Sequence, residues 1–99
     1  MALSENQKKY LRGLGHRLKP IVIIADAGLT TSVAREVETS ILHHELIKVS
    51  IRVGDREARA AVIASLCAEK STELVQRIGN IALLYRENPE RKNRIRLPN

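Results

Sequence analysis

The 99-residue sequence predicts an α/β (α+β) fold, in which three helices pack on a four-stranded mixed sheet in the order α-β-α-β-α-β-β. Residues 21–24 form an unbroken run of Ile and Val, which is typical of a core strand. Residues 46–53 alternate apolar and polar side chains, as in a strand with one buried face. Other segments place apolar residues three or four apart, which is the helical spacing. A chain of this length supports one hydrophobic core, so we expect a single domain over residues 1–99.

The first helix is expected to begin after Ser4, which can cap it. Gln7, three residues later, would complete a capping box. Gly13 and Gly15 are expected to end the helix. Its apolar stripe is expected to consist of Leu3, Gln7, Tyr10, Leu11 and Leu14.

The first strand, residues 21–24, is expected to be buried on both faces. It leads through the small-residue connection Ala25–Gly28 into a second helix, from about Thr31 to His43. The apolar residues of this helix stand at helical spacing. They are Val33, Val37 and Ile41.

The second strand, residues 46–53, is expected to turn a polar and partly basic face to solvent. Gly54 breaks this strand, and Asp55 can cap a third helix that runs to about Lys70. One face of this helix has side chains small enough to lie close on the sheet, and we expect this face to pack there. It is marked by Ala58, Ala61, Val62, Ser65, Leu66 and Glu69.

The last two strands are expected at residues 74–78 and 81–85. Gly79-Asn80 between them is a two-residue signal for a hairpin turn. An irregular basic tail follows, from about residue 87 to residue 99.

Positive charge is concentrated at the two ends of the chain. The net charge is +6 and the isoelectric point is about 10.0. Residues 1–20 have a net charge of +4 and residues 86–96 a net charge of +3, whereas residues 21–85 have a net charge of −1. This distribution is typical of a protein that binds a polyanion. The alternative is a solvated basic face without a specific partner.

The sequence lacks the features that membrane-spanning, secreted and disulfide-bonded proteins need. No run of about eighteen apolar residues could span a membrane, and the first residues lack the apolar segment of a signal peptide. We therefore expect a cytoplasmic protein with no membrane partner. The single cysteine, Cys67, cannot form an internal disulfide or a multi-cysteine metal site. It is expected to be a buried packing residue.

Catalytic and metal-binding patterns are also missing. The adjacent histidines His43 and His44 lack the i, i+4 spacing of a zinc pair, so no metal or other cofactor is expected. The spacing of the polar residues shows no catalytic group, so we expect neither an enzyme nor a small-molecule substrate. Nothing in the sequence demands a dimer, and a monomer is expected.

The segment from residue 21 to residue 30 could bind a phosphate, because small side chains let an anion approach the N-terminus of a helix closely. Packing alone would equally explain its Gly and Ala residues. Base stacking is not expected, since the chain has no Phe or Trp and Tyr10 and Tyr85 are expected in the core. RNA binding would then rest mainly on phosphate contacts.

Four separated segments resemble one known family. They are residues 11–20, residues 25–30, residues 43–49 and residues 78–86. Together they are similar to the YhbY family of bacterial CRM-domain proteins (chloroplast RNA splicing and ribosome maturation), and the similarity covers nearly the whole chain. It implies a stand-alone RNA-binding domain, related in fold to the C-terminal domain of translation initiation factor three. It also implies association with ribosomal RNA in precursors of the large ribosomal subunit and a part in their assembly.

CRM domains carry a GxxG loop between the first strand and the second helix, similar to the loop with which K-homology domains hold an RNA backbone. Here the loop reads Ala25-Asp26-Ala27-Gly28, so Gly28 alone keeps the motif. A positive φ would be costly at Ala25, and Asp26 adds a negative charge. We therefore expect RNA binding to depend less on the loop and more on basic residues around it, above all Lys8, Arg12 and Lys19.

The expected RNA-binding residues combine the first helix, the linker that follows it, the loop and the tail. They are Lys8, Lys9, Arg12, His16, Arg17, Lys19, Ala25, Asp26, Ala27, Gly28, Thr30 and Arg94.

Two other functions remain open from the sequence. One is a protein–protein adaptor on the assembling ribosome or on an assembly GTPase, with little affinity for naked RNA. The other is a small phosphate-handling enzyme, for which Asp26 is the one titratable side chain in the loop.

Overall fold

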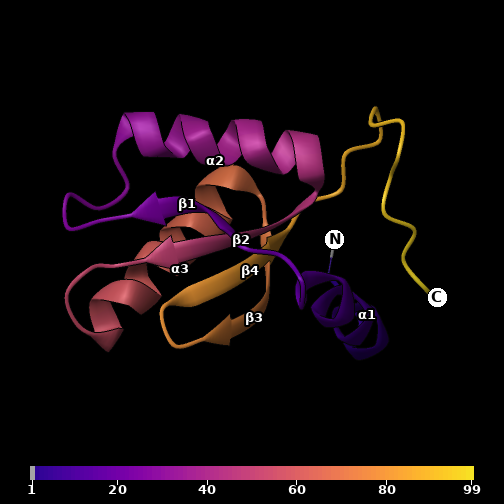
Figure 1. Cartoon of the computed structure of the whole chain (residues 1–99), viewed down its shortest axis with the longest axis horizontal. Coiled ribbons are helices and arrows are strands. Elements are labelled where there is room, and N and C mark those ends of the chain that lie inside the picture. Colours follow the sequence, from indigo (N-terminus) through magenta and orange to yellow (C-terminus); the bar gives the residue numbers. More distant parts are fainter. Residues whose placement is uncertain (1) are drawn as a thin grey trace.

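The computed structural model describes residues 2–99 and confirms the predicted element order (Figure 1). The three helices and four strands are α1 (Glu5–Gly15), β1 (Pro20–Ile24), α2 (Thr31–His44), β2 (Leu46–Ile51), α3 (Arg56–Lys70), β3 (Glu73–Ile78) and β4 (Ile81–Tyr85). The strands form one sheet in the order β1-β2-β4-β3. β1 is parallel to β2, and the other two pairings are antiparallel, so the sheet is mixed as predicted.

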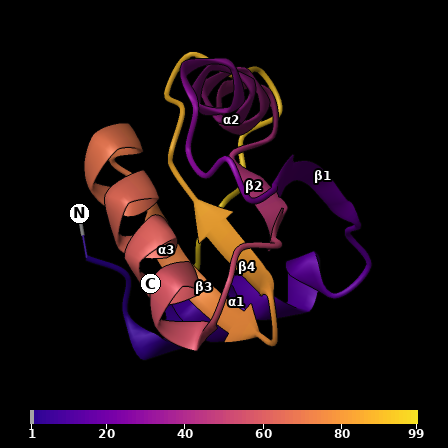
Figure 2. The ribbon, with the colours of Figure 1, turned by 90° about the vertical axis from the view of Figure 1, so that its left-hand side faces the viewer.

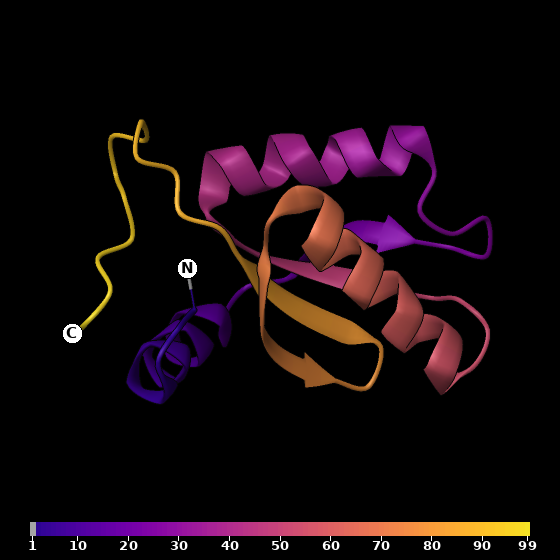
Figure 3. The same cartoon turned by 180° about the vertical axis from the view of Figure 1, so that it is seen from behind.

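The helices lie on both faces of the sheet (Figures 2 and 3). α2 and α3 cover one face, where residues such as Val37 and Leu66 pack on Val22, Val49 and Leu84. α1 covers part of the other face, in a smaller apolar cluster. Its buried members are Leu3, Leu11, Leu46, Val75, Leu83 and Tyr85.

Local sequence signals account for the ends of the helices. The Ser4 hydroxyl accepts a hydrogen bond from the Gln7 backbone N–H at 3.1 Å, and the Gln7 side chain accepts one from the Ser4 N–H at 3.0 Å. This is the predicted capping box. Asp55 caps α3 through the Ala58 N–H at 2.8 Å, as predicted. The β3–β4 turn is the predicted hairpin, with Gly79 at a φ of +58°.

The prediction that the first strand is buried on both faces is wrong. β1 is an edge strand. Ile21 and Ile23 lie on the sheet face that α1 partly covers, but α1 does not reach them, and their side chains are 45% and 49% exposed. The prediction of a polar outer face on β2 is also wrong in part. Ser50 is buried, because β2 is central and Ser50 lies between Ile23 and Ile81 in one row across the sheet.

The predicted packing face of α3 is displaced. Ile63 and Leu66 are the buried residues of this helix, because these large aliphatic side chains fill the space above the sheet. Val62 and Cys67 pack beside them and are partly buried. Four residues of the predicted face are exposed, namely Ala58, Ala61, Ser65 and Glu69.

The predicted stripe of α1 is likewise too wide. Tyr85 is in the core as predicted, whereas Tyr10 is 42% exposed and Leu14 is exposed as well. α1 meets the sheet closely along Leu11 and Gly15. A Cβ added at Gly15 would lie 2.7 Å from the Leu83 side chain, so the helix approaches the sheet where a side chain has no room. Gly15 ends the helix as predicted, but Gly13 lies within it.

Candidate nucleic-acid interface

The basic residues of α1 and of the linker after it lie on the surface without acidic partners. In the described residues 2–99, no carboxylate forms an ion pair with Lys8, Lys9, Arg12, Arg17 or Lys19. Lys9, Arg17 and Lys19 are exposed, as is His16, and Lys8 and Arg12 are half-buried. Their positive charges are therefore available to an anion.

The C-terminal tail docks beside α1, which brings the two basic ends of the chain together (Figure 1). Ile95 and Leu97 pack on the apolar cluster that holds Leu11. The Gln7 side-chain amide donates a hydrogen bond to the Pro98 carbonyl at 3.0 Å. The sequence predicts an irregular basic tail. In the structure it packs on the protein.

Glu45 anchors the tail. Its carboxylate is fully buried and accepts hydrogen bonds from the Asn88 N–H at 2.8 Å, the Ile95 N–H at 2.7 Å and the Arg91 guanidinium at 2.9 Å. Burial alone would raise the pKa of this carboxyl, but the three hydrogen bonds together lower the pKa below its ordinary value. Glu45 also has a φ of +64°, a conformation that non-glycine residues rarely adopt.

Ion pairs involve three of the five cations of residues 86–96, and only Lys92 and Arg96 have none within residues 2–99. Arg86 pairs with Glu38 through two hydrogen bonds of 3.0 and 2.6 Å, which lower the pKa of the Glu38 carboxyl. Arg91 pairs with Glu45, and Arg94 pairs with Glu87. Arg94 therefore differs from the predicted RNA-binding cations of α1, because its charge already has a partner.

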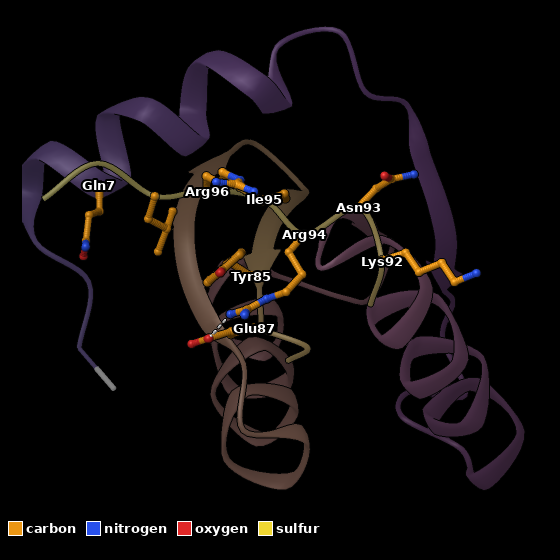
Figure 4. A pocket seen from close by; sticks show the side chains of 9 residues that line it. Gln7, Tyr85, Glu87, Lys92, Asn93, Arg94, Ile95 and Arg96 are labelled. Atoms are coloured by element: carbon orange, nitrogen blue, oxygen red, sulfur yellow. Dashed lines mark hydrogen bonds and ion pairs between the residues drawn. The ribbon is translucent and has the colours of Figure 1, made fainter. Parts of the chain in front are cut away.

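A hollow of about 740 Å³ lies between α1, β4 and the tail (Figure 4). Tyr85 and the Glu87–Arg94 pair lie at its centre, and Gln7 contributes from α1. Burial raises the pKa of the Tyr85 phenol to about 12, so this group stays a neutral hydrogen-bond donor near pH 7. The remaining lining residues come from the tail. They are Lys92, Asn93, Ile95, Arg96 and Leu97.

The β1–α2 loop is a tight turn in which the Gly28 N–H donates to the Ala25 carbonyl at 2.8 Å. Gly28 has a φ of +76°, whereas Ala25 does not have a positive φ. Replacement of the first glycine of the GxxG pattern by Ala25 therefore causes no backbone strain here. Asp26 and Ala27 are exposed at the tip of the turn, and Thr30 caps α2 through the Val33 N–H at 3.2 Å.

The predicted RNA-binding residues do not form one site. The loop follows the C-terminal end of β1, while Lys19 precedes the N-terminal end of the same strand. The longest dimension of the molecule is 37 Å, and the loop and α1 lie at opposite ends of it (Figure 1). The expectation that Lys8, Arg12 and Lys19 surround the loop is therefore wrong.

Other basic residues lie at the loop end instead, and they are not among the RNA-binding residues predicted from the sequence. The Arg52 N–H donates to the Ile24 carbonyl at 2.7 Å, which places Arg52 directly beside the start of the loop. Arg56, Arg59 and Arg77 line a depression near the β3–β4 turn. The net charge of residues 21–85 concealed them, because that segment contains eight acidic residues against seven basic ones. The i, i+3 spacing of Arg56 and Arg59 at a predicted helix start was the available signal.

Metal-binding and membrane-spanning features are absent from the described part of the chain. No group of three or more His, Cys, Asp or Glu residues in residues 2–99 could hold a metal ion.

The rings of His43 and His44 meet edge to face, with 4.6 Å between their centroids. Burial lowers the pKa of His44. Among residues 2–99, no helix has the length and apolar character to cross a membrane.

Comparisons with known proteins agree with the resemblance seen in the sequence. The sequence model of the CRS1/YhbY (CRM) domain matches residues 3–86. A Pseudomonas aeruginosa protein named as a probable RNA-binding protein is 47% identical over 90 residues, which are 91% of this chain and 86% of that protein. A Haemophilus influenzae protein named as an RNA-binding protein is 44% identical, covering 97% of this chain and 95% of the relative.

A solved structure has the same fold. The solution structure of a hypothetical protein from Staphylococcus aureus, described as a candidate RNA-binding protein, superposes with a TM-score of 0.83. The two chains are 33% identical, and the superposition covers 98% of this chain and all of the other.

Proposed function

The chain belongs to the CRS1/YhbY (CRM) domain family, and on that basis we propose that it binds RNA and acts in assembly of the large ribosomal subunit. Its partner would be ribosomal RNA in the precursor of that subunit. The names of the relatives support RNA as the partner. The resemblance to the YhbY family supports the ribosomal precursor as its source.

One observation carries the proposal on the molecule itself. The cations of α1 and the linker are exposed or half-buried, and none has an acidic partner in residues 2–99. Lys8 and Arg12 are one helical turn apart and can contact successive phosphates. The β1–α2 loop lies at the other end of the molecule and would contribute a separate contact there.

Binding of this kind is mainly electrostatic. The affinity falls as the salt concentration rises. Each phosphate that a cation neutralises steepens this fall in log K by about 0.9 per log unit of salt on a duplex and by about 0.7 on a single strand. Tyr10 is exposed next to Lys9 and offers one aromatic face to a base. Sequence preference would come from RNA shape more than from base contacts.

The test is binding to large-subunit ribosomal RNA fragments at several salt concentrations, with duplex DNA as competitor. The α1 triple variant replaces Lys8, Lys9 and Arg12 with Ala. It should bind RNA about a hundredfold more weakly at 0.1 M salt and show a salt slope that is smaller by about 2.

The control variant replaces Arg35, Lys92 and Arg96 with Ala. These three cations are exposed, and their loss changes the net charge by the same amount. Because they come from α2 and the tail, the control should retain most of the RNA affinity. Equal losses in the two triple variants, or no RNA binding by the unmodified protein, would contradict the proposal.

One observation favours the adaptor function as a second candidate. The part of its sheet face that α1 leaves uncovered carries Ile21, Ile23 and Ile78, and Ile78 is 66% exposed. Exposed aliphatic side chains on one face are typical of a protein-binding surface. A protein that bound no naked RNA but bound maturing ribosomal particles would support this function.

A further inference from the structure

Three arginines converge on a depression of about 250 Å³ at the loop end of the molecule. Arg56 and Arg59 come from the first turn of α3, Arg77 comes from β3, and Gly79 completes the lining. One water occupies about 30 Å³ in the liquid, so the depression has room for an oxyanion with some of its water. In the views of Figures 1 and 3 the start of α3 and the β3–β4 turn lie at the end opposite to α1.

Backbone carbonyls, and not carboxylates, accept hydrogen bonds from the guanidinium groups of Arg59 and Arg77. Arg59 donates to the Gly54 carbonyl at 3.1 Å and the Val53 carbonyl at 3.4 Å. Arg77 donates to the carbonyl of Arg56 at 3.4 Å. None of the three arginines forms an ion pair within residues 2–99, so their charges are not neutralised. The hydrogen bonds orient the guanidinium groups of Arg59 and Arg77.

Unused hydrogen-bond donors accompany these charges. The Nε of Arg59 is buried and has no hydrogen-bond partner among the described residues. An unsatisfied buried donor is costly. The remaining guanidinium N–H groups of Arg56, Arg59 and Arg77 are the donors that a bound anion would accept hydrogen bonds from. The nearby Asp55 carboxylate accepts the capping hydrogen bond of α3 from the Ala58 N–H.

The backbone around the depression is tied together. The Ile51 N–H donates to the Asn80 carbonyl at 2.7 Å, which joins β2 to the β3–β4 turn. The Arg52 N–H joins the same segment to the end of β1. Groups held in place before binding lose less entropy when a ligand arrives.

From these observations we infer that Arg56, Arg59 and Arg77 form a phosphate-binding site. Its ligand is a phosphodiester of an RNA backbone. Guanidinium groups match the oxygens of a phosphate with paired hydrogen bonds, and three of them meet here. An RNA that contacts both this site and α1 must extend along the 37 Å axis or supply two separate segments. The choice of RNA rests on the proposed function, whereas the phosphate site does not.

The first test uses inorganic pyrophosphate as the probe, added to the full chain at constant ionic strength. The Nε–Hε resonances of the arginines are followed by NMR. Those of Arg56, Arg59 and Arg77 should shift and saturate, and those of the exposed Arg35 should not. Shifts of equal size at Arg35 would overturn the site, as would the absence of shifts in the cluster.

The second test measures RNA affinity. The Arg56→Gln/Arg77→Gln variant should bind large-subunit RNA fragments about five- to tenfold more weakly, with a salt slope smaller by about 1. The control Arg35→Gln/Lys92→Gln removes the same charge from two separate exposed positions and should change affinity less than twofold. The backbone NMR spectrum of each variant reports whether the fold is retained.

A charge-conserving variant separates geometry from charge. Arg56→Lys/Arg77→Lys keeps both charges but loses the planar fork, so its RNA affinity should fall between those of the Gln variant and the unmodified protein. If the Gln variant matches its control while the α1 triple variant loses affinity, the inference fails and the proposed function stands. If the unmodified protein binds no RNA, the proposed function fails and the pyrophosphate titration decides on the site.

Discussion

The two ends of this molecule differ in how much of their positive charge is available. At one end, α1 and the tail come from the two segments that are most basic in the sequence, but three arginines of the tail are paired with carboxylates. At the other end, Arg56, Arg59 and Arg77 come from a segment with a net negative charge, and none of them is paired in residues 2–99. Net charge along the chain therefore does not give the charge that a ligand meets.

The reason is that ion pairs form between residues far apart in sequence. Arg86 and Glu38 are 48 positions apart, and Arg91 and Glu45 are 46 positions apart. Folding brings these carboxylates to the tail, where they attach it to the protein. We expect the paired cations of the tail to contribute to stability, and the unpaired cations of α1 and of the start of α3 to contribute to RNA affinity.

The largest effect should follow from removing the anchor of the tail. Glu45→Ala leaves the Arg91 guanidinium and two backbone N–H groups without their acceptor, which should lower the free energy of unfolding by about 3 kcal/mol. Urea denaturation measures this loss. Glu36→Ala, at an exposed position on α2, is the control and should change stability by less than about 0.5 kcal/mol. A similar small change in Glu45→Ala would show that the tail contacts do not stabilise the fold.

Acid should act on the same contacts. The pKa values of Glu45 and Glu38 are lowered in the folded protein. Their stabilising contribution is therefore present above the ordinary carboxyl pKa of 4.5 and is lost as the pH falls through the lowered values. Thermal unfolding between pH 7 and pH 2 should show this loss, and Glu45→Gln should show a smaller one. An equal loss in Glu45→Gln would assign the acid sensitivity to other groups.

A matched pair of single changes compares paired with unpaired cations. Arg12→Ala and Arg94→Ala alter the net charge equally, but the Arg94 charge is already balanced by Glu87. We expect RNA affinity to fall about fivefold for Arg12→Ala and less than twofold for Arg94→Ala. Filter binding at 0.1 M salt is sufficient to measure both. A larger loss of RNA affinity in Arg94→Ala than in Arg12→Ala would show that the tail, and not α1, contacts the RNA.

The smallest effect is expected in the loop. Asp26 is exposed at the tip of the β1–α2 turn, where its charge repels a phosphate. Asp26→Asn should leave RNA affinity equal or raise it by up to about twofold, because the interaction of exposed charges is screened by water and salt. A loss of RNA affinity in this variant would contradict an unfavourable role for the carboxylate.

Local signals in the sequence predict most of the fold. The caps at Ser4 and Asp55 and the Gly79-Asn80 turn depend on neighbouring residues, and all three are confirmed. Burial was predicted less well, because it depends on the order of the strands and on where α1 ends. The exposure of Ile23 follows from the edge position of β1, which no local pattern reveals.

The candidate site was predictable only in its parts. The unpaired cations of α1 were identified from helical spacing. Their distance from the loop was not, because it depends on β1 lying between α1 and the loop in the folded molecule. The arginine cluster joins the start of α3 to β3 across about twenty positions, and only the folded sheet brings them together.

The most direct test of this account is a map of RNA contacts on the protein by backbone amide NMR, with a large-subunit ribosomal RNA fragment as the ligand. We expect the largest shifts at both ends of the molecule, in α1 around Lys9 and Arg12 and at the start of α3 around Arg56. The amides of Arg91 and Glu45 should change little. Shifts confined to the tail, or to the part of the sheet around Ile78 that α1 leaves uncovered, would contradict the claim that the unpaired cations of α1 and of the start of α3 bind the RNA.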